Sequence, residues 1–406
     1  MNKSSFSINI VITIFFSIII FVLIYNSLIY PTIIPVVKDG TIILFRDWQI
    51  VVIANICDGK GYDVYIENPC DFWKSRHVYG KILLNLPLVE KNLYFYFTLF
   101  PVISNLVFLY LSVSFFLIDK KKSNILYAFI FILSVPFILV IERANIDIII
   151  FLFIFLIAKY KNLILSHLVV ILTTMIKFYP IALMGIFLMT KKIKNILINL
   201  IISIFTIAIL IFLQKESLIK IINNKLQFSG SGVYGFSIFN FFRPLDNENY
   251  YIFMIFFGIF CFFVYLYRNC FFSIDKNFFF LKKNEFENRL FFLSSLVIIT
   301  CYFAFTNFFY REIFLLGLLP YLFLNLHNSE EKQLTKLILF FLSFKFLLTT
   351  ILVILERNQI LSSSYDKFLT LTKHSVDLFL IILLGYIFVI NLIIFIRTKF
   401  NYSNQR

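Results

Sequence analysis

The sequence has few charged residues and few of the residues that break helices. Of its 406 residues, 15% are charged and 60% are hydrophobic, while Gly and Pro number only 11 and 9. A soluble domain usually has about 25% charged and about 45–50% apolar residues. This composition, with a mean hydropathy of +0.90, excludes an ordinary soluble protein and predicts an all-α polytopic membrane protein.

Metal-binding and nucleotide-binding motifs are also lacking. The five Cys show neither CxxC nor Cys/His spacing, so no metal site is predicted. No Gly-rich loop of the kind that cradles nucleotide phosphates occurs. The net charge of +15 is spread over short intervals without forming a basic patch, which argues against a nucleic-acid partner.

Twelve apolar segments are candidates for membrane-spanning helices. A span needs about 20 apolar residues, and fewer where the local structure recesses it. The first segment lacks a small-residue cleavage site, so we expect it to remain as a helix. The segments lie near residues 8–30, 93–118, 125–141, 146–158, 163–176, 179–190, 196–213, 250–267, 289–306, 312–326, 334–355 and 376–396.

Lys and Arg set the predicted orientation. With the N-terminus inside, basic residues far outnumber acidic ones in the inward intervals, whereas the outward intervals are nearly balanced. The bias is strongest in short turns such as DKKKSN (119–124) and KKIKN (191–195), where the positive-inside rule has most force. Both termini are therefore expected to be cytoplasmic.

Three predicted helices, 146–158, 163–176 and 179–190, are shorter than an ordinary span. Fusing the last two would place 191–195 outside, which the charge bias opposes. Polar residues at recessed helix ends are tolerated only where they line a cavity or pair within the bundle. We therefore expect an outward-opening cavity floored by the turns ERANID (142–147) and KFYP (177–180).

The chain is predicted to form one membrane domain, 1–406, with outward inserts at 31–92 and 214–249. In the first insert, 41–56 is mostly apolar. That composition suits a helix lying in the outer membrane interface rather than a soluble loop. Gly59 and Gly61 are expected to end this helix.

Asp47 is the candidate catalytic residue. It lies a short way past the first span, at the start of the predicted interfacial helix. A carboxylate at the membrane–water border can take a proton from a hydroxyl while staying close to a lipid substrate. The alternative is a structural role, in which Asp47 is paired with the adjacent Arg46 or is solvated.

The stretch GYDVYIENPCD (61–71) supplies further candidates. It contains Asp63 and Tyr65, and Arg76 follows shortly after. Its many turn residues predict a fixed loop conformation, which serves either a substrate or simply a structural lid. Cys57 and Cys70 both lie in this outward insert, where a disulfide is permitted in an oxidising compartment.

The turn ERANID places Glu142, Arg143, Asn145 and Asp147 between apolar helices. These side chains could contact a substrate in the expected cavity. They also have a purely structural explanation. Glu142 and Arg143 can neutralise each other, Asn145 can cap the next helix, and an acid in the first helical turn is favoured by the dipole.

Outward cations are candidates for a phosphate site. Lys177 and Tyr179 belong to the turn KFYP, and Arg243 and Arg311 lie at later predicted helix ends. Lys177 could extend toward the headgroups or bind phosphate. Arg suits phosphate because its planar fork binds two oxygens at once. Several cations around one cavity would need an anion to share.

Together these patterns resemble the GT-C superfamily of membrane glycosyltransferases. Within it, they look most like the polyprenyl-phosphate-mannose-dependent mannosyltransferase-like family (glycosyltransferase family 87). The resemblance rests on Asp47 followed by Gly-Tyr-Asp-Val-Tyr (61–65), on ERANID opening a helix, and on Lys-Phe-Tyr-Pro (177–180). It covers roughly residues 10–195, and the remainder only in layout. Ala144 stands where the family usually has Gly.

The resemblance implies a specific activity. Such enzymes take a sugar from a polyprenyl-phosphate carrier at the extracytoplasmic face of the bacterial plasma membrane and pass it to an acceptor hydroxyl on a glycolipid or glycan. The Asp of the first outward loop, here Asp47, is the general base, and the anomeric configuration inverts. A divalent metal is compatible with this chemistry, but no ligand cluster demands one.

Two other classes compete with this interpretation. A transporter or flippase of lipid-linked sugars would place charged or broken segments at mid-membrane. Within the predicted spans only Lys345 lies plainly at mid-span, which favours an enzyme. An O-antigen ligase or polymerase usually has its largest outward loop late in the chain, whereas here the largest comes first.

Overall fold

The chain is helical throughout its described part. The computed structural model describes residues 3–26, 29–33, 43–118, 122–189, 193–223, 234–237, 285–304, 309–326, 332–358, 360 and 363–403, and within them no β-strand occurs. Six of these helices are long and apolar enough to cross a membrane, or seven if one bent pair counts as a single span. The protein is therefore an all-α protein of multi-pass membrane character.

The helices divide between two compact units. Unit 1 comprises residues 1–40, 111–138 and 229–406, and unit 2 comprises 41–110 and 139–228. The helices α4 (Phe100–Phe116) and α6 (Val135–Arg143) contribute residues to both. The single domain of 1–406 stays a prediction.

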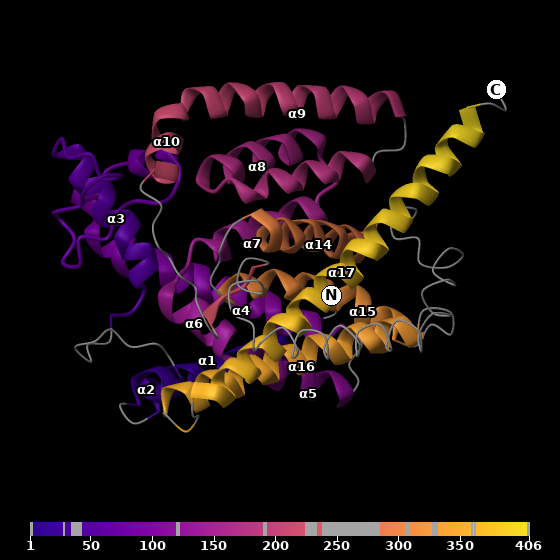
Figure 1. Cartoon of the computed structure of the whole chain (residues 1–406), viewed down its shortest axis with the longest axis horizontal. Helices are drawn as coiled ribbons and strands as arrows, with labels where there is room; N and C mark the ends of the chain where they lie inside the picture. Colours follow the sequence, from indigo (N-terminus) through magenta and orange to yellow (C-terminus); the bar gives the residue numbers. More distant parts are fainter. Residues whose placement is uncertain are drawn as a thin grey trace. The chain divides into compact units, whose positions relative to one another are not determined.

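Unit 1 holds the N-terminal helix and the C-terminal helices (Figure 1). Its remaining elements are α1 (Lys3–Tyr25), α2 (Tyr30–Ile33), α5 (Lys122–Ile132), α14 (Phe286–Ala304), the 3₁₀ helix η6 (Phe309–Leu318), α15 (Leu319–Asn325), α16 (Lys332–Arg357) and α17 (Ser363–Ser403). Helix α14 packs against η6 and α17, and α16 packs against α17, α5 and α2. This packing brings the polar residues of η6, α16 and α17 into the interior.

Unit 2 holds residues 41–92 of the first insert and the short helices that follow it. Its remaining elements are α3 (Arg46–Gly59), the short 3₁₀ helices η1 (Lys81–Asn85) and η2 (Glu90–Asn92), the π-helix η3 (Phe95–Leu99), α7 (Asp147–Lys159), α8 (Leu163–Ile176), the 3₁₀ helix η4 (Tyr179–Met189), α9 (Ile193–Leu213) and α10 (Lys215–Asn223). Helix α8 lies beside α7, η4 and α9, while α3 packs against η1 and η3. Figure 1 shows α8 running alongside α9.

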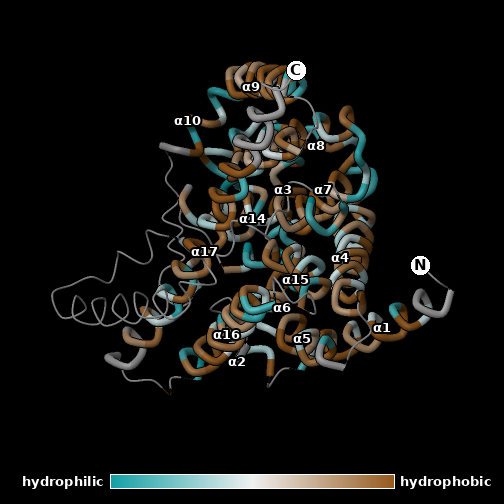
Figure 2. The backbone as a smooth tube through the Cα atoms, turned by 90° about the vertical axis from the view of Figure 1, so that its right-hand side faces the viewer, coloured by the Kyte–Doolittle hydropathy of each residue, from teal (hydrophilic) through white to brown (hydrophobic). Residues whose placement is uncertain are grey.

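Each of the six candidate spans overlaps one of the predicted apolar segments. They are Ser7–Tyr25, Phe95–Phe116, Lys194–Leu213, Phe286–Phe303, Lys332–Arg357 and Phe368–Ile394. Figure 2 shows α9 as hydrophobic along most of its length, and only 22% of its span is buried within the protein. Such an exposed apolar helix is stable only where lipid covers it. The total of twelve spans and the side of the termini stay predictions, and segment 250–267 lies outside the described residues.

One predicted span is broken. The segment 125–141 forms two helices, Asn124–Ile132 and Val135–Arg143, that meet at an angle of 55°. Pro136 explains the break, because proline lacks an amide hydrogen and its ring clashes with the carbonyl of residue i−4. The neighbouring Val135 amide instead donates to Thr350 Oγ1 of α16, at 3.1 Å.

Two further segments differ from their predicted form. The segment 312–326 is divided into η6 and α15, and α15 has a proline, Pro320, in its first turn. Helix α17 begins at Ser363, well before the predicted start at 376. The added part of the helix contains Lys373 and His374, whose side chains are buried beside Asp377.

Candidate functional site

Asp47 lies in the first turn of α3 in unit 2. The helix follows Phe45, whose φ of 62° places it in the left-handed region and whose amide donates to the Glu142 carbonyl at 2.6 Å. This bond joins the start of α3 to the end of α6. The Asp47 carboxylate therefore lies beside the turn between α6 and α7, although Asp47 and Asn145 are 98 positions apart in the sequence.

The Asp47 carboxylate has two partners from that turn. Asn145 Nδ2 donates to Asp47 Oδ2 at 2.6 Å, and Arg143 Nη1 lies 3.9 Å from Asp47 Oδ1. The side chain of Asp47 is 19% exposed. The structural alternative in which Asp47 pairs with Arg46 is wrong, because Arg46 bonds Asp71 Oδ2 at 2.6 Å instead.

The turn 142–147 is shaped by its own side chains. Arg143 Nε lies 3.1 Å from Glu142 Oε2, so these two residues do neutralise each other in part. Asn145 Oδ1 accepts from the Asp147 amide at 3.0 Å, which satisfies a free N–H at the start of α7. The expected Glu142–Arg143 pair and the expected contact of Asn145 with the start of the next helix are thus both observed. Neither uses the side-chain NH₂ group of Asn145, which contacts Asp47.

Lys177 and Tyr179 converge on Asp147. Tyr179 Oη donates to Asp147 Oδ1 at 2.6 Å, and Lys177 Nζ forms an ion pair with the same oxygen. Asp147 is fully buried, and Lys177 is only 7% exposed. Extension of Lys177 to the headgroups is therefore excluded, since its ammonium group is held inside unit 2 beneath the ring of Tyr79, 5.1 Å away.

Asn145 connects the buried pair to Asp47. Its Oδ1 atom also lies 3.4 Å from Lys177 Nζ, so two donors face this oxygen. An amide whose oxygen faces donors must direct its NH₂ group the other way, and here that group meets Asp47. Three sequence stretches, around residues 47, 145 and 178, therefore form one hydrogen-bonded network with Asp47 at its exposed end.

Other predicted residues of the first insert have partners within unit 2. Asp63 Oδ2 lies 2.5 Å from Lys220 Nζ of α10, which Figure 1 shows beside α3. Tyr65 donates to the Tyr79 carbonyl at 3.3 Å, and burial raises the pKa of the Tyr65 hydroxyl to about 12. Arg76 is exposed. The contacts of Asp63 and Tyr65 stabilise the loop that follows α3, and neither involves Asp47.

The loop after α3 has the fixed conformation that its turn residues predict. A disulfide joins Cys57 to Cys70, with the Cα atoms 5.7 Å apart. Asp63 Oδ1 accepts from the Tyr65 amide at 3.2 Å. The His77 amide donates to the Val64 carbonyl at 2.9 Å, which ties the two ends of the loop together.

The two remaining predicted cations are Arg311 and Arg243. Arg311 is partly buried at the start of η6 in unit 1. Arg243 lies outside the described residues. The shared cation cavity expected from the sequence therefore stays a prediction, and Arg143 is the cation that contacts Asp47.

Unit 1 contains a second polar cluster that the sequence analysis missed. Glu312 of η6, Lys345 of α16, and Lys373 and Asp377 of α17 are all fully buried. We call these four residues the charged ring. Lys345 pairs with Asp377 and with Glu312, the latter at 2.8 Å. Lys373 lies 3.1 Å from Asp377 and 3.8 Å from Glu312, so each cation faces both acids.

The charged ring corrects one argument made from the sequence. Lys373 and Asp377 lie within the candidate span Phe368–Ile394, so the statement that only Lys345 lies at mid-span is wrong. Their spacing of four residues is a signal of an ion pair on one helix face. The apolar residues on both sides of this pair would have allowed the helix to be extended across it.

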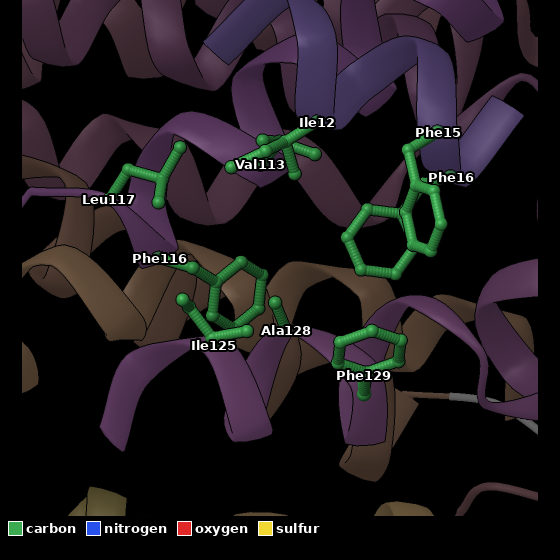
Figure 3. A pocket seen from close by; sticks show the side chains of 9 residues that line it. All are labelled: Ile12, Phe15, Phe16, Val113, Phe116, Leu117, Ile125, Ala128 and Phe129. Atoms are coloured by element: carbon green, nitrogen blue, oxygen red, sulfur yellow. The ribbon is translucent and has the colours of Figure 1, made fainter. Parts of the chain in front are cut away.

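An apolar pocket lies elsewhere in unit 1. It has a volume of about 250 Å³ and is lined by residues of α1, the end of α4 and α5, among them Phe16, Phe116 and Phe129 (Figure 3). None of its nine lining residues carries a polar side-chain group. A sugar or phosphate needs hydrogen-bonding partners when it leaves water, so this pocket is unsuited to either.

The described residues contain no group of three or more His, Cys, Asp or Glu side chains placed to hold a metal ion. Comparisons of the chain with protein-family models, with curated proteins and with solved structures find no match.

Proposed function

We propose that the protein is a membrane glycosyltransferase of the GT-C type, similar to glycosyltransferase family 87. It transfers a mannose-like hexose from a polyprenyl-phosphate donor to a glycolipid or glycan hydroxyl. The reaction takes place at the extracytoplasmic face of a bacterial plasma membrane. The observation that carries the proposal is the network that links Asp47, Asn145 and Lys177, because it unites the three stretches on which the resemblance rests.

Asp47 acts as the general base in this proposal. Its Oδ2 atom is engaged by Asn145, whereas Oδ1 faces the Arg143 guanidinium at the longer distance of 3.9 Å. Oδ1 is thus the atom that takes the proton from the acceptor hydroxyl. The acceptor oxygen then bonds to the anomeric carbon from the face opposite the phosphate, and the carbon–oxygen bond to phosphate breaks with inversion.

The leaving polyprenyl phosphate needs a cation. Lys177 is neutralised by the buried Asp147, which reduces its value as a phosphate partner. Arg143 is also paired with a buried acid, Glu142, but unlike Lys177 it is 21% exposed beside Asp47. We therefore assign the phosphate contact to Arg143, whose guanidinium can stabilise the charge that develops on the leaving oxygen.

The direct test is transfer of labelled hexose from polyprenyl-phosphate-mannose or -glucose to membrane glycolipids by the purified protein. Asp47→Asn should lower turnover by about 100-fold or more, because general-base catalysis contributes about 10²–10⁴-fold. Asp58→Asn, in the last turn of the same helix, is the matched control. Unchanged turnover in Asp47→Asn would remove it as the base.

Arg143→Gln tests the proposed phosphate contact. It should lower turnover, because the guanidinium stabilises charge that develops on the leaving oxygen, and it should raise the KM for the donor if the ground-state phosphate is bound as well. The hexose alone, without its polyprenyl phosphate, should bind the variant and the parent protein equally. Unchanged turnover together with an unchanged KM would exclude Arg143 from the phosphate site.

The charged ring favours a second candidate, a transporter of lipid-linked sugars. Charged residues within membrane spans are costly and often mark transport pathways. The ring holds two cations and two acids, which neutralise one another, so it also has a purely structural explanation. Glycosyl transfer proceeds in detergent solution, whereas transport requires a sealed vesicle. Movement of the lipid-linked sugar in proteoliposomes, without transfer in detergent, would favour the transporter.

A further inference from the structure

Residues 70–76 of the first insert combine exposed aromatic and basic side chains, and we call them the Trp73 loop. Phe72 is 82% exposed, the largest exposure among the described hydrophobic residues of this insert. Lys74 and Arg76 are exposed as well, and Trp73 is partly exposed. Aromatic rings beside cations are typical of segments that lie in the headgroup layer of a membrane.

The exposure of Phe72 is built into the structure of the loop. Cys70 is tied to α3 by the disulfide to Cys57. Asp71 Oδ2 accepts from the Ser75 amide at 2.9 Å and from the Arg46 guanidinium at 2.6 Å. These bonds fix both ends of the loop, and Phe72 is exposed between them.

Trp73 is held in the same way. Its ring lies 4.1 Å from the guanidinium carbon of Arg46, and its edge meets the ring of Phe72 with centroids 5.5 Å apart. A cation over the face of an indole is attracted by the ring quadrupole. The loop thus presents a preformed surface, so binding does not require further ordering of the chain.

We propose that the Trp73 loop inserts into the headgroup layer of an anionic bilayer and anchors the first insert to the membrane surface. The bilayer is favoured over a soluble partner by charge complementarity, since Lys74 and Arg76 flank the apolar residue and suit acidic headgroups. The inference concerns a surface apart from Asp47 and does not depend on the proposed activity.

The chain contains only two Trp, which makes the test direct. Trp48 is 3% exposed, and its indole donates to the Tyr96 carbonyl at 2.8 Å, so it should be retained for folding. The full-length protein is reconstituted either in anionic bilayers that contain phosphatidylglycerol or in zwitterionic bilayers of phosphatidylcholine, and in both the lipid is brominated on the upper part of its acyl chains. The signal of Trp73 is obtained by subtracting the fluorescence of Trp73→Phe protein.

We expect brominated lipid to quench Trp73 strongly and aqueous iodide to quench it weakly. Each cation near an anionic surface contributes about fivefold to the inserted-to-free ratio. Lys74→Gln with Arg76→Gln should therefore lower that ratio by roughly 25-fold in anionic bilayers, and have little effect in zwitterionic ones. Phe72→Ser should reduce lipid quenching in both.

Ile66→Ser is the matched control, because Ile66 is 50% exposed in the same insert but is followed by the exposed acid Glu67. It should leave the quenching of Trp73 unchanged. Quenching of Trp73 by iodide but not by brominated lipid would overturn the proposal. A Trp73 signal that responds to soluble glycan instead of lipid would overturn it too, and would assign the loop to acceptor binding.

Discussion

Ala144 holds the turn between α6 and α7 at a φ of 43°, in the left-handed region of the backbone. For a residue with a Cβ atom, this conformation costs about 1–2 kcal/mol of conformational free energy. Glycine avoids that cost, which gives a physical reason for the Gly that is usual in the resembled family. The position matters because the next residue, Asn145, binds Asp47.

Ala144→Gly should change the free energy of unfolding by less than about 1 kcal/mol. Relief of the left-handed strain is offset by the flexibility of glycine, about 0.5–1 kcal/mol, and by the loss of a buried methyl group, about 0.8 kcal/mol. Ala144→Val should destabilise by more than about 2 kcal/mol, because a β-branched residue is a poor fit at positive φ. Denaturation of both variants in detergent measures this, and equal stability of the two would contradict it.

His77 makes the stability of the first insert depend on pH. It is buried between the rings of Tyr65 and Tyr79, and burial lowers its pKa from 6.5 to about 4. The unfolded insert therefore binds more protons than the folded one between these pH values. Stability is full above about pH 7 and falls by up to about 3 kcal/mol as the pH drops to 4.

His77→Phe should remove this dependence, since a phenyl ring fills the aromatic site without titrating. Thermal unfolding of both proteins between pH 7 and pH 4.5 provides the measurement. An identical pH slope in the variant would show that other groups cause it.

Gly80 connects two elements at the scale of secondary structure. It precedes η1, and its amide donates to the Ile176 carbonyl at the end of α8, 3.0 Å away. A Cβ atom at this position would lie 1.7 Å from the Met175 carbonyl oxygen. Only glycine allows the insert to approach α8 so closely, directly before the buried Lys177.

Gly80→Ala should therefore cost about 1–3 kcal/mol or more, because the backbone of η1 or α8 must shift. Gly59→Ala, at the end of α3, is the matched control, since a methyl group added there would meet nothing within 4 Å. Thermal melting in detergent compares the two. A small effect of Gly80→Ala would mean that the insert can move away from α8 without loss.

The elements themselves were largely predictable. The helices predicted at 146–158 and 163–176 are observed within a residue or two, because each is an apolar run bounded by polar turns. The helix at 179–190 occurs as well, but it is wound as a 3₁₀ helix. At about 2.0 Å per residue, this winding makes it as long as the α-helix α8, despite its fewer residues. The apolar pattern of the sequence does not distinguish a 3₁₀ helix from an α-helix here, so the winding of 179–189 could not be predicted.

At the scale of the whole molecule, the side of the membrane on which each interval lies can be tested. Lys194→Cys, at the start of α9, should be shielded from a membrane-impermeant maleimide in intact cells, whereas Lys60→Cys should react. The expected difference follows from the positive-inside rule. The cysteines other than Cys57 and Cys70 are replaced, and the disulfide between these two is retained. Labelling of position 194 from outside would refute the topology.

Much of the protein follows from the sequence alone. Low charge, long apolar runs and scarce helix breakers specify a multi-pass helical chain, because backbone groups in lipid must be satisfied within each segment. The same local information identifies the polar turns in which Asp47, Asn145 and Lys177 lie. It could not identify their partners, since a hydrogen bond between distant residues leaves no periodic trace in the sequence.

Only the tertiary structure decided which polar residues pair with which. In the folded protein Arg46 pairs with Asp71, Lys177 pairs with Asp147, and Asn145 donates a hydrogen bond to Asp47. The structure also showed that Lys373 and Asp377 are buried opposite Lys345 and Glu312. The physical reason is that the cost of burying a charge depends on its partner, and the partner is chosen by packing.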